Sequence, residues 1–240
     1  MTAELAGQTV VLIGGSAGIG LETARRARAE GAAVILTGRD PDKLKQAVAE
    51  VGAVDSAAFD ANDPVAVARF FQDVPAIDQV LVTAGGPHYG PLLEMDADQV
   101  RDAVSGHIAV ALGIARNAVG RMRPGGTLLF MGGTGGRRIG HGMGIVSAAT
   151  AAMPPFVAAL ALEIAPVRAN VIAAGFVDTP LSASLLGDKL DERRAELRST
   201  LPIGRVVTAA DVAALAVHIM ANTALTGATY DIDGGQQFAF

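Results

Sequence analysis

The sequence predicts a single α/β domain over residues 1–240, in which helices cover both faces of a seven-stranded parallel sheet. Short apolar runs alternate along the chain with longer segments whose apolar residues recur at helical spacing. The runs are apolar at consecutive positions, which is typical of strands buried on both faces. No linker, low-complexity segment or fixed repeat divides the 240 residues, a length that is common for one α/β domain.

Seven apolar runs are the expected strands, and they cover residues 9–13, 33–37, 57–59, 79–83, 127–131, 169–173 and 228–232. The first run is rich in β-branched residues and ends at Gly14, after which apolar residues from Ile19 to Ala27 recur at helical spacing. The same alternation is repeated along the chain. Parallel strands joined by right-handed helical crossovers form a doubly wound, Rossmann-type sheet.

Helices are expected at residues 41–51, 64–71, 96–122, 142–162 and 209–220. The segment 142–162 carries no formal charge, and its length is close to the roughly 20 residues that span a bilayer. Pro154 and Pro155 interrupt it, and its many alanines favour close packing against other protein. We therefore expect a buried helix and no membrane partner. The loop 176–186 should leave the carboxyl ends of the strands and form a lid over a ligand.

Composition excludes several classes of function. The net charge of −5 argues against a nucleic-acid partner, because such partners require a basic face. There is no cysteine, so disulfides and thiolate catalysis are excluded. The four histidines show no pairing at metal-ligand spacing, so no metal is predicted. The first residues carry an acid and lead straight into a strand, so we expect a cytoplasmic chain without a leader.

The segment from Gly14 to Gly20 is the expected nucleotide site. It follows the first strand and opens the first helix, so backbone N–H groups and the helix dipole can face a pyrophosphate. Glycine allows the phosphate to approach without a clash with a Cβ atom. A tight turn without a ligand has the same local pattern, but the βα units that follow favour nucleotide binding.

The end of the second strand predicts which nucleotide is bound. Gly38 and Arg39 stand where a carboxylate would accept the ribose hydroxyls of NAD, and a guanidinium there suits a 2′-phosphate. The cofactor is therefore predicted to be NADP(H), although Arg39 as a solvated partner of Asp40 is the alternative. Asp60, after the third strand, is expected either at the adenine amino group or as the cap of the helix at Pro64.

Four separated motifs resemble those of the short-chain dehydrogenase/reductase family, in the order and on the elements of that family. They are Gly14-x-x-x-Gly18-Ile19-Gly20, Thr83-Ala84-Gly85, Gly175-Phe176-Val177-Asp178-Thr179-Pro180 and Asp233-Gly234-Gly235. The resemblance covers essentially the whole chain. It implies an NAD(P)(H)-dependent oxidoreductase that acts on a small-molecule substrate and assembles as a homo-oligomer, a dimer or a tetramer.

The resemblance also implies which residues hold the cofactor. Gly14, Ser16, Gly18, Ile19 and Gly20 would lie at the pyrophosphate, Arg39 and Asp60 at the adenosine, Ala84 and Gly85 beside the ribose, and Thr179 at the nicotinamide carboxamide. Departures occur even here, since Ile13, Thr83 and Ala174 stand where the family usually has Thr, Asn and Pro.

The catalytic residues of the family are absent. Counting along the motifs places Gly133 or Thr134 at the usual serine, Val146 and Thr150 at the usual tyrosine and lysine, and His107 at the usual asparagine. A shifted alignment does not restore the motif, because the chain's two tyrosines and three lysines all lie outside the helix at 142–162. In the family, the tyrosine protonates the forming alkoxide and the lysine lowers its pKa. General acid catalysis contributes about 10²- to 10⁴-fold in rate, so its loss weakens ketone reduction without preventing hydride transfer.

Three hypotheses remain open. The first is an NADP(H)-dependent oxidoreductase with a non-standard site, which either uses a replacement acid or acts on an imine or iminium group. Thr134 and His107 are the candidate catalytic residues, with His141 and Tyr89 on the rim, while a structural role for His107 is the alternative. The second is a sensor or scaffold that binds NADP(H) without turnover. The third is a non-redox lyase or isomerase with a histidine base.

Overall fold

The structure, a computed structural model, describes residues 4–239. Seven parallel strands form one sheet in the order β3-β2-β1-β4-β5-β6-β9. Their bounds are β1 Thr9–Ile13, β2 Ala33–Gly38, β3 Asp55–Ala58, β4 Ile77–Val82, β5 Met122–Gly133, β6 Arg168–Ala174 and β9 Thr229–Ile232. The predicted doubly wound α/β fold is confirmed.

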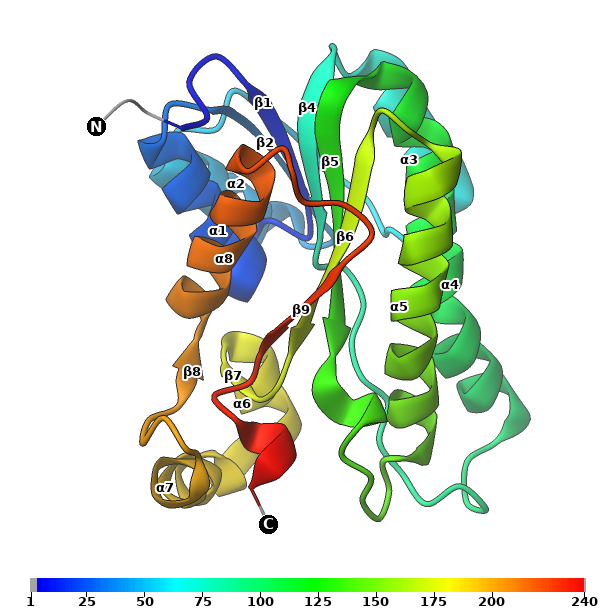
Figure 1. Ribbon diagram of the computed structural model, residues 1–240, viewed down its shortest axis with the longest axis vertical. Helices are drawn as coiled ribbons and strands as arrows, with labels where there is room; N and C mark the ends of the chain where they lie inside the picture. The colour runs from blue at the N-terminus through cyan, green and yellow to red at the C-terminus, as the bar shows by residue number, and fades with distance from the viewer. Residues whose placement is uncertain (1–3, 240) are drawn as a thin grey trace.

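Helices cover both faces of this sheet (Figure 1). On one face lie α1 Gly18–Ala29, α2 Pro41–Val51 and α8 Ala209–Ala221. On the other lie α3 Pro64–Asp73, α4 Ala97–Ala118 and α5 Gly144–Glu163. Each face buries its own apolar cluster, around Leu12 and Leu36 on the α1 side and around Phe71 and Phe130 on the α4 side. Residues that alternate along one strand therefore serve two cores, as expected for a parallel sheet.

The carboxyl end of the sheet carries additional elements that the sequence did not predict. Beyond β6, the chain forms β7 Val177–Asp178, α6 Pro180–Leu186 and α7 Leu190–Thr200, and β8 Val207–Thr208 then pairs with β7. The expected loop at 176–186 is therefore a short strand followed by a helix. Thr179 caps α6 by accepting a hydrogen bond from the Ser182 backbone. Short 3₁₀ turns complete the chain at η1 Val119–Arg121, η2 Thr134–Gly136, η3 Gly187–Lys189 and η4 Gln236–Phe238.

Two helix predictions were partly wrong. The helix predicted to reach residue 122 ends at Ala118, and Met122 already belongs to β5, where it pairs with Ile77. Pro154 and Pro155 do not interrupt α5 but lie inside it. They remove the N–H groups that would bond the carbonyls four residues earlier, and burial of one face of α5 on the sheet outweighs this loss.

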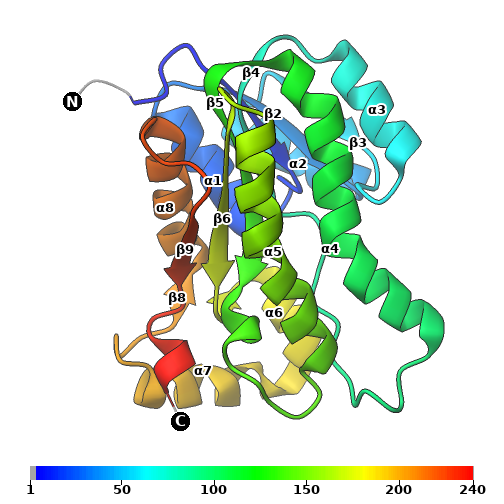
Figure 2. The ribbon, with the colours of Figure 1, turned by 45° about the vertical axis from the view of Figure 1, so that its right-hand side comes forward.

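Within residues 4–239, α5 is the one helix long and apolar enough, by length and composition, to cross a membrane. It packs against β5, β6 and α4 (Figure 2). Val146, Met153 and Val157 are among its buried residues. This packing agrees with the prediction of a buried helix, because the apolar character of α5 is explained by the core that it helps to form.

A buried arginine fixes the end of the sheet opposite the carboxyl ends of the strands. Arg168 opens β6 and is only 4% exposed. Its guanidinium donates to five carbonyl oxygens, those of Gly125, Ile219, Met220, Asn222 and Leu225, at 2.9–3.2 Å. Since the last carbonyls of a helix have no partner within the helix, Arg168 completes the end of α8 and joins it to the sheet.

Candidate nucleotide-binding and catalytic site

The glycine-rich turn between β1 and α1 is packed so closely that its glycines cannot be replaced without movement. A Cβ atom on Gly20 would lie 2.2 Å from the Gly14 carbonyl oxygen, and one on Gly14 would lie 2.6 Å from Thr83 Oγ1. Gly14 and Gly18 also have positive φ angles of 98° and 53°. Ile19 anchors the start of α1 in the core on that face. The backbone N–H groups at the start of α1 are thus held ready for an anion.

Thr83 holds this turn against the end of β4. Its hydroxyl donates to the Gly14 carbonyl at 2.9 Å, and its backbone N–H donates to the Ile13 carbonyl at 2.8 Å. The family usually has asparagine here, so a hydroxyl takes over the contact between the two strand ends. Ala84 and Gly85 follow at once, and Gly85 has a φ of 109° with no atom within 4 Å of where a Cβ would be. The ribose predicted to lie beside them would therefore have space.

Ser16 and Arg39 come together at the end of β2. A Cβ atom on Gly38 would lie 2.8 Å from Ser16 Oγ, so the serine side chain lies directly over the residue that precedes Arg39. Arg39 is exposed, and within the described residues it has no ion pair. Asp40 instead caps α2 through the backbone N–H groups of residues 42 and 43 and pairs with Lys43. The alternative prediction, in which Arg39 pairs with Asp40, is therefore wrong.

Asp60 does not cap a helix. Asp63 caps α3, while Asp60 accepts hydrogen bonds from the backbone and side-chain nitrogens of Asn62, both at 2.9 Å. These contacts hold its carboxylate at the end of β3, two strands away from the glycine-rich turn. The predicted capping role is therefore wrong, and contact with an adenine stays a prediction.

Thr179 lies over the glycine-rich turn. A Cβ atom on Gly18 would be 3.5 Å from Thr179 Cβ, although the two residues are far apart in sequence. The start of α6 therefore covers the start of α1. An ion pair that sequence reasoning missed holds α6 and α7 near the sheet, since Arg194 donates to both carboxylate oxygens of Asp178 at 2.7 and 2.9 Å. The two partners are 16 residues apart and belong to no shared motif, so no sequence signal revealed them.

Gly133 and Thr150, predicted at the positions of the family's serine and lysine, lie close together, with Thr134 as the alternative for the serine. A Cβ atom on Gly133 would lie 3.2 Å from Thr150 Cγ2, which is tighter than an ordinary contact. The Thr150 hydroxyl donates to the carbonyls of Val146 and Ser147 within α5, at 2.8 and 3.2 Å. It therefore points back onto its own helix. Neither residue offers a proton donor to a ligand.

Thr134 begins η2, directly after β5. The residue is buried, and within the described part of the chain its hydroxyl has no hydrogen-bond partner. Since no fully buried side-chain polar atom in this part lacks a partner, the Thr134 hydroxyl reaches accessible surface. It is free to donate to a ligand.

His107 lies half-buried on α4. Burial and the nearby His88 lower the pKa of its ring, while a hydrogen bond to the Ala103 carbonyl acts in the opposite direction. The ring is therefore mostly uncharged at neutral pH, and one N–H is already used by that carbonyl. An uncharged imidazole in this state can accept a hydrogen bond from a ligand, but it is a poor proton donor.

Two loops close over this region. The loop after β4 carries His88 and Tyr89, and the loop after η2 carries His141. The Gly90 N–H donates to the Gly142 carbonyl at 2.9 Å, which joins the two loops. Tyr89 is more than half exposed, but partial burial of its ring raises the pKa of its hydroxyl, and the positive charge of Arg193 on α7 acts against this rise.

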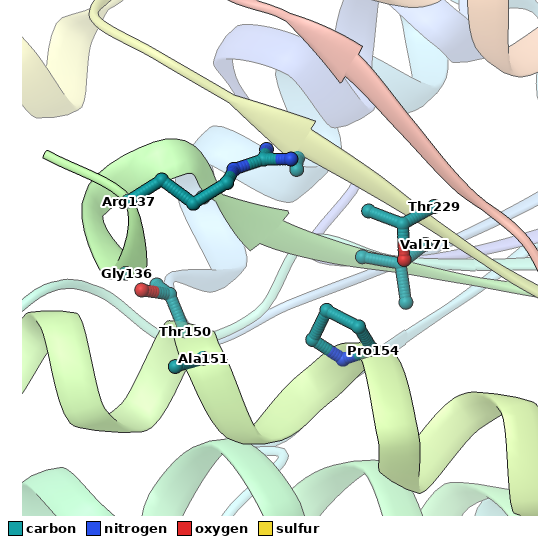
Figure 3. A pocket seen from close by; sticks show the side chains of 9 residues that line it. Gly136, Arg137, Thr150, Ala151, Pro154, Val171 and Thr229 are labelled. Carbon is teal, nitrogen blue, oxygen red and sulfur yellow. The ribbon is translucent and has the colours of Figure 1, made fainter. Parts of the chain in front are cut away.

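A separate cavity of about 180 Å³ lies between α5 and the strands β5, β6 and β9 (Figure 3). Thr150, Ala151 and Pro154 line it from α5, and Val171 and Thr229 line it from the strands. Arg137 reaches over it and forms an ion pair with Asp231 of β9. The charge of Arg137 is thus neutralised within the chain, and the cavity contains no residue of the glycine-rich turn.

A strand, a glycine-rich turn and a helix at the head of a doubly wound sheet form the architecture of a dinucleotide-binding protein. The chain belongs to the short-chain dehydrogenase/reductase family, because the family profile described as enoyl-(acyl carrier protein) reductase matches residues 14–237. The resemblance in the sequence is thereby confirmed.

Individual relatives cover nearly the whole chain. The chain is 32% identical over 256 residues to the short-chain reductase protein NovJ of Streptomyces niveus, which covers 94% of this chain and 92% of NovJ. It is 26% identical to the NADP-dependent (R)-specific alcohol dehydrogenase of Lentilactobacillus kefiri, with 98% of each chain covered. The crystal structure of BdcA in complex with NADPH has a TM-score of 0.86 and 29% identity, over 97% of this chain and 95% of BdcA. These relatives agree with the NADP(H) prediction.

Proposed function

We propose that this protein binds NADP(H) across the carboxyl ends of β1, β2 and β4 and acts as an oxidoreductase on a small-molecule imine, iminium or carbonyl compound. The observation that carries the proposal is the glycine-rich turn, where a Cβ atom on Gly20 would meet the Gly14 carbonyl at 2.2 Å. So tight a turn keeps its backbone N–H groups open to a pyrophosphate. Gly14, Ser16, Gly18, Ile19 and Gly20 form this part of the site.

Preference for NADP(H) over NAD(H) rests on the end of β2. Ser16 and Arg39, which has no ion pair within the described residues, provide a hydroxyl and a guanidinium where the 2′-phosphate of NADP(H) would lie. The neighbouring Asp40 carboxylate is occupied by the first N–H groups of α2 and by Lys43. Asp60 contacts the adenine, Ala84 and Gly85 lie beside the ribose, and Thr179 lies at the nicotinamide. NADPH complexes among the structural relatives support this assignment.

The chemistry follows from what the site lacks. Bound NADPH supplies a hydride, and its acceptor carbon needs either a proton donor for the neighbouring atom or a charge already present there. Val146 and Thr150 provide no acid. An iminium ion needs none, because the electron pair of its C=N bond moves to a cationic nitrogen and leaves a neutral amine. For a carbonyl, the Thr134 hydroxyl can donate a hydrogen bond to the developing alkoxide, and His107 positions the substrate as an acceptor.

Positioning alone accounts for substantial catalysis. Holding donor and acceptor in reacting geometry contributes about 7–11 kcal/mol, whereas a general acid contributes about 10²- to 10⁴-fold, or roughly 3–5 kcal/mol. The site therefore favours reduction of an iminium over that of a ketone by up to the roughly 3–5 kcal/mol that a general acid would contribute.

Assembly and location are part of the proposal. We propose a cytoplasmic homotetramer or dimer in which the exposed flanks of the paired helices α4 and α5 meet a second copy. These two helices pack side by side along one face of the molecule (Figure 2). The resemblance to the family supports this arrangement.

A sensor or scaffold that binds NADP(H) without turnover is the second candidate. The observation that favours it is the Thr150 hydroxyl, which is bonded within α5 so that the lysine position contributes nothing to a ligand. The turn that would hold the nucleotide is nevertheless complete. A non-redox role for His107 has less support, because Arg39 would then have no function.

One experiment separates these candidates. NADPH and NADH are titrated into the purified protein while nicotinamide fluorescence is followed, and a cyclic imine or a ketone is then added. Tight NADPH binding followed by imine-dependent oxidation supports the oxidoreductase, and Thr134→Val should slow carbonyl reduction more than iminium reduction. Binding without oxidation of any substrate in the panel leaves the sensor. Failure to bind either nucleotide refutes both.

A further inference from the structure

Large apolar side chains are exposed around the proposed substrate entrance. Twelve large apolar residues are exposed in the described part of the chain, and six of them lie in three short segments. We call these six the apolar rim: Tyr89, Leu92, Leu93, Ile139, Leu181 and Leu185. Exposed apolar side chains scattered singly are ordinary, but a cluster of them indicates a surface that binds something apolar.

Each of the three segments leaves the sheet from a residue of the proposed site. The segment of Tyr89, Leu92 and Leu93 follows Gly85, that of Ile139 follows Thr134, and α6 follows Thr179. In Figure 1 all three lie beyond the carboxyl ends of the strands, at the lower end of the molecule. The rim therefore borders the space through which a substrate would reach the nicotinamide.

Contacts join two of the three segments, the loop after β4 and the segment before α5. The Gly90 N–H bonds the Gly142 carbonyl, and Leu92 lies so close to α5 that a Cβ atom on Gly144 would be 2.7 Å from Leu92 Cδ2. The positive charge of Arg193 on α7 acts to lower the pKa of Tyr89, so α7 lies within electrostatic range of this loop. By contrast, the fully exposed Leu93 contributes almost nothing to the core, since its relative accessibility is 101%.

Several charges at this entrance are already partnered, whereas Glu94 and Arg138, next to Leu93 and Ile139, form no ion pair within the described residues. Arg193 pairs with Glu196 at 2.6 Å, Arg194 with Asp178, and Asp96 caps α4. Arg137 pairs with Asp231 on the far side of the η2 loop. Neither a carboxylate nor a cation is left in these pairs to select a charged substrate tail, whereas the apolar side chains are left uncovered.

We propose that the apolar rim selects substrates with an extended apolar part, such as an alkyl chain or fused rings, attached to the group that is reduced. This inference rests on the proposed function and names its substrate class. The reacting group reaches Thr134 and His107 at the base, while the apolar part lies between the loop after β4 and helix α6. Burial of a methylene is worth about 0.8 kcal/mol, so each added methylene strengthens binding up to about fourfold.

The test uses binding, so it does not depend on turnover. The NADP⁺-loaded protein is titrated calorimetrically with 2-alkylpyrrolidines whose chain grows from one to six carbons, and NADPH oxidation is followed with the matching 2-alkyl-1-pyrrolines. We expect the Kd of the wild-type protein to fall about two- to fourfold per methylene. Leu93→Ser/Leu185→Ser, which removes one side chain from each side of the entrance, should flatten this dependence and leave the Kd for NADPH unchanged.

Val54→Ser is the matched control, because Val54 is 59% exposed just before β3, at the opposite end of the sheet from the rim and outside α4 and α5. It should keep the wild-type dependence on chain length. Equal slopes in the wild type and Leu93→Ser/Leu185→Ser, or no slope in the wild type, overturn the proposal. If the wild-type Kd does not depend on chain length and the double variant changes the oligomeric state, the rim is a subunit interface. If the wild-type Kd does not depend on chain length and the protein binds phosphatidylcholine vesicles, the rim is a lipid-binding surface. A slope without NADPH oxidation by either the pyrrolines or the matching alkyl ketones refutes the oxidoreductase and leaves the apolar ligand site standing.

Discussion

Replacing Arg39 by serine tests the choice of cofactor at one residue. The guanidinium is exposed and free of ion pairs within the described residues, so the substitution breaks no internal contact. A hydrogen bond to a charged group contributes about 1.5–3 kcal/mol, and exposure to solvent places this one at the lower end of that range. About 1.4 kcal/mol corresponds to a tenfold change in affinity. We therefore expect Arg39→Ser to raise the Kd for NADPH about tenfold and to leave the Kd for NADH nearly unchanged.

The assay is fluorescence titration of both nucleotides at fixed ionic strength, and the measured quantity is the ratio of the two dissociation constants. Lys45→Ser is the matched control, because it removes an equally exposed positive charge from α2 without altering the end of β2. If the NADPH to NADH ratio of Arg39→Ser equals that of the wild type, Arg39 does not recognise the 2′-phosphate. Equal losses in both variants would mean that net charge alone accounts for the preference.

Three further predictions concern the turn, the buried histidine and the buried arginine. Gly20→Ala should weaken NADPH binding at least about tenfold, since its Cβ would meet the Gly14 carbonyl at 2.2 Å. Gly113→Ala is the control, because its Cβ would meet nothing within 4 Å, and equal Kd values for NADPH in the two variants would contradict this prediction. The pKa of His107 in the folded protein lies below its ordinary 6.5, so the unfolded chain binds a proton more readily than the folded chain. The free energy of unfolding therefore decreases as the pH falls below about 6.5. Between pH 7.5 and 5.5, the Tm of His107→Asn should therefore fall less than that of the wild type. An equal fall in Tm would mean that other groups cause the pH dependence. Arg168→Met removes the guanidinium from five carbonyls, of which the Leu225 carbonyl keeps a bond from Asn170, and should cost about 3–5 kcal/mol, lowering Tm by about 6–20 °C. A fall in Tm no larger than that of the exposed Arg121→Met would refute the structural role of Arg168.

The sheet was predictable because its strands are apolar at consecutive positions. Runs such as 9–13 and 79–83 are buried on both faces, and that requirement appears directly in the amino-acid sequence. The glycine-rich turn was predictable for a similar reason, since close packing such as that of Gly20 against the Gly14 carbonyl admits no side chain. Local constraints of this kind leave a local pattern.

Features that depend on distant partners left no such pattern. Pro154 and Pro155 argue locally for a break, yet packing of α5 on the sheet keeps the helix continuous. The pairing of β7 with β8 joins residues 30 positions apart and uses only two residues of each strand. The sequence left open whether Arg39 pairs with Asp40, and the structure shows Asp40 capping α2, a role that sequence reasoning missed. The roles of Thr134 and His107 in catalysis remain predictions.

The contact between Gly133 and Thr150 bears on how such a site could arise and whether it could revert. A serine placed at 133 would bring its Cβ to 3.2 Å from Thr150 Cγ2, so the first step back towards the family's residues meets a steric obstacle created by the second position. A lysine at 150 without the tyrosine at 146 would place a cation beside an apolar valine. The change at 133 is thus hindered while Thr150 is present, and the change at 150 is unfavourable while Val146 is present. Such dependence between positions is epistasis, and it would make the predicted departure from the family's residues difficult to undo by single substitutions.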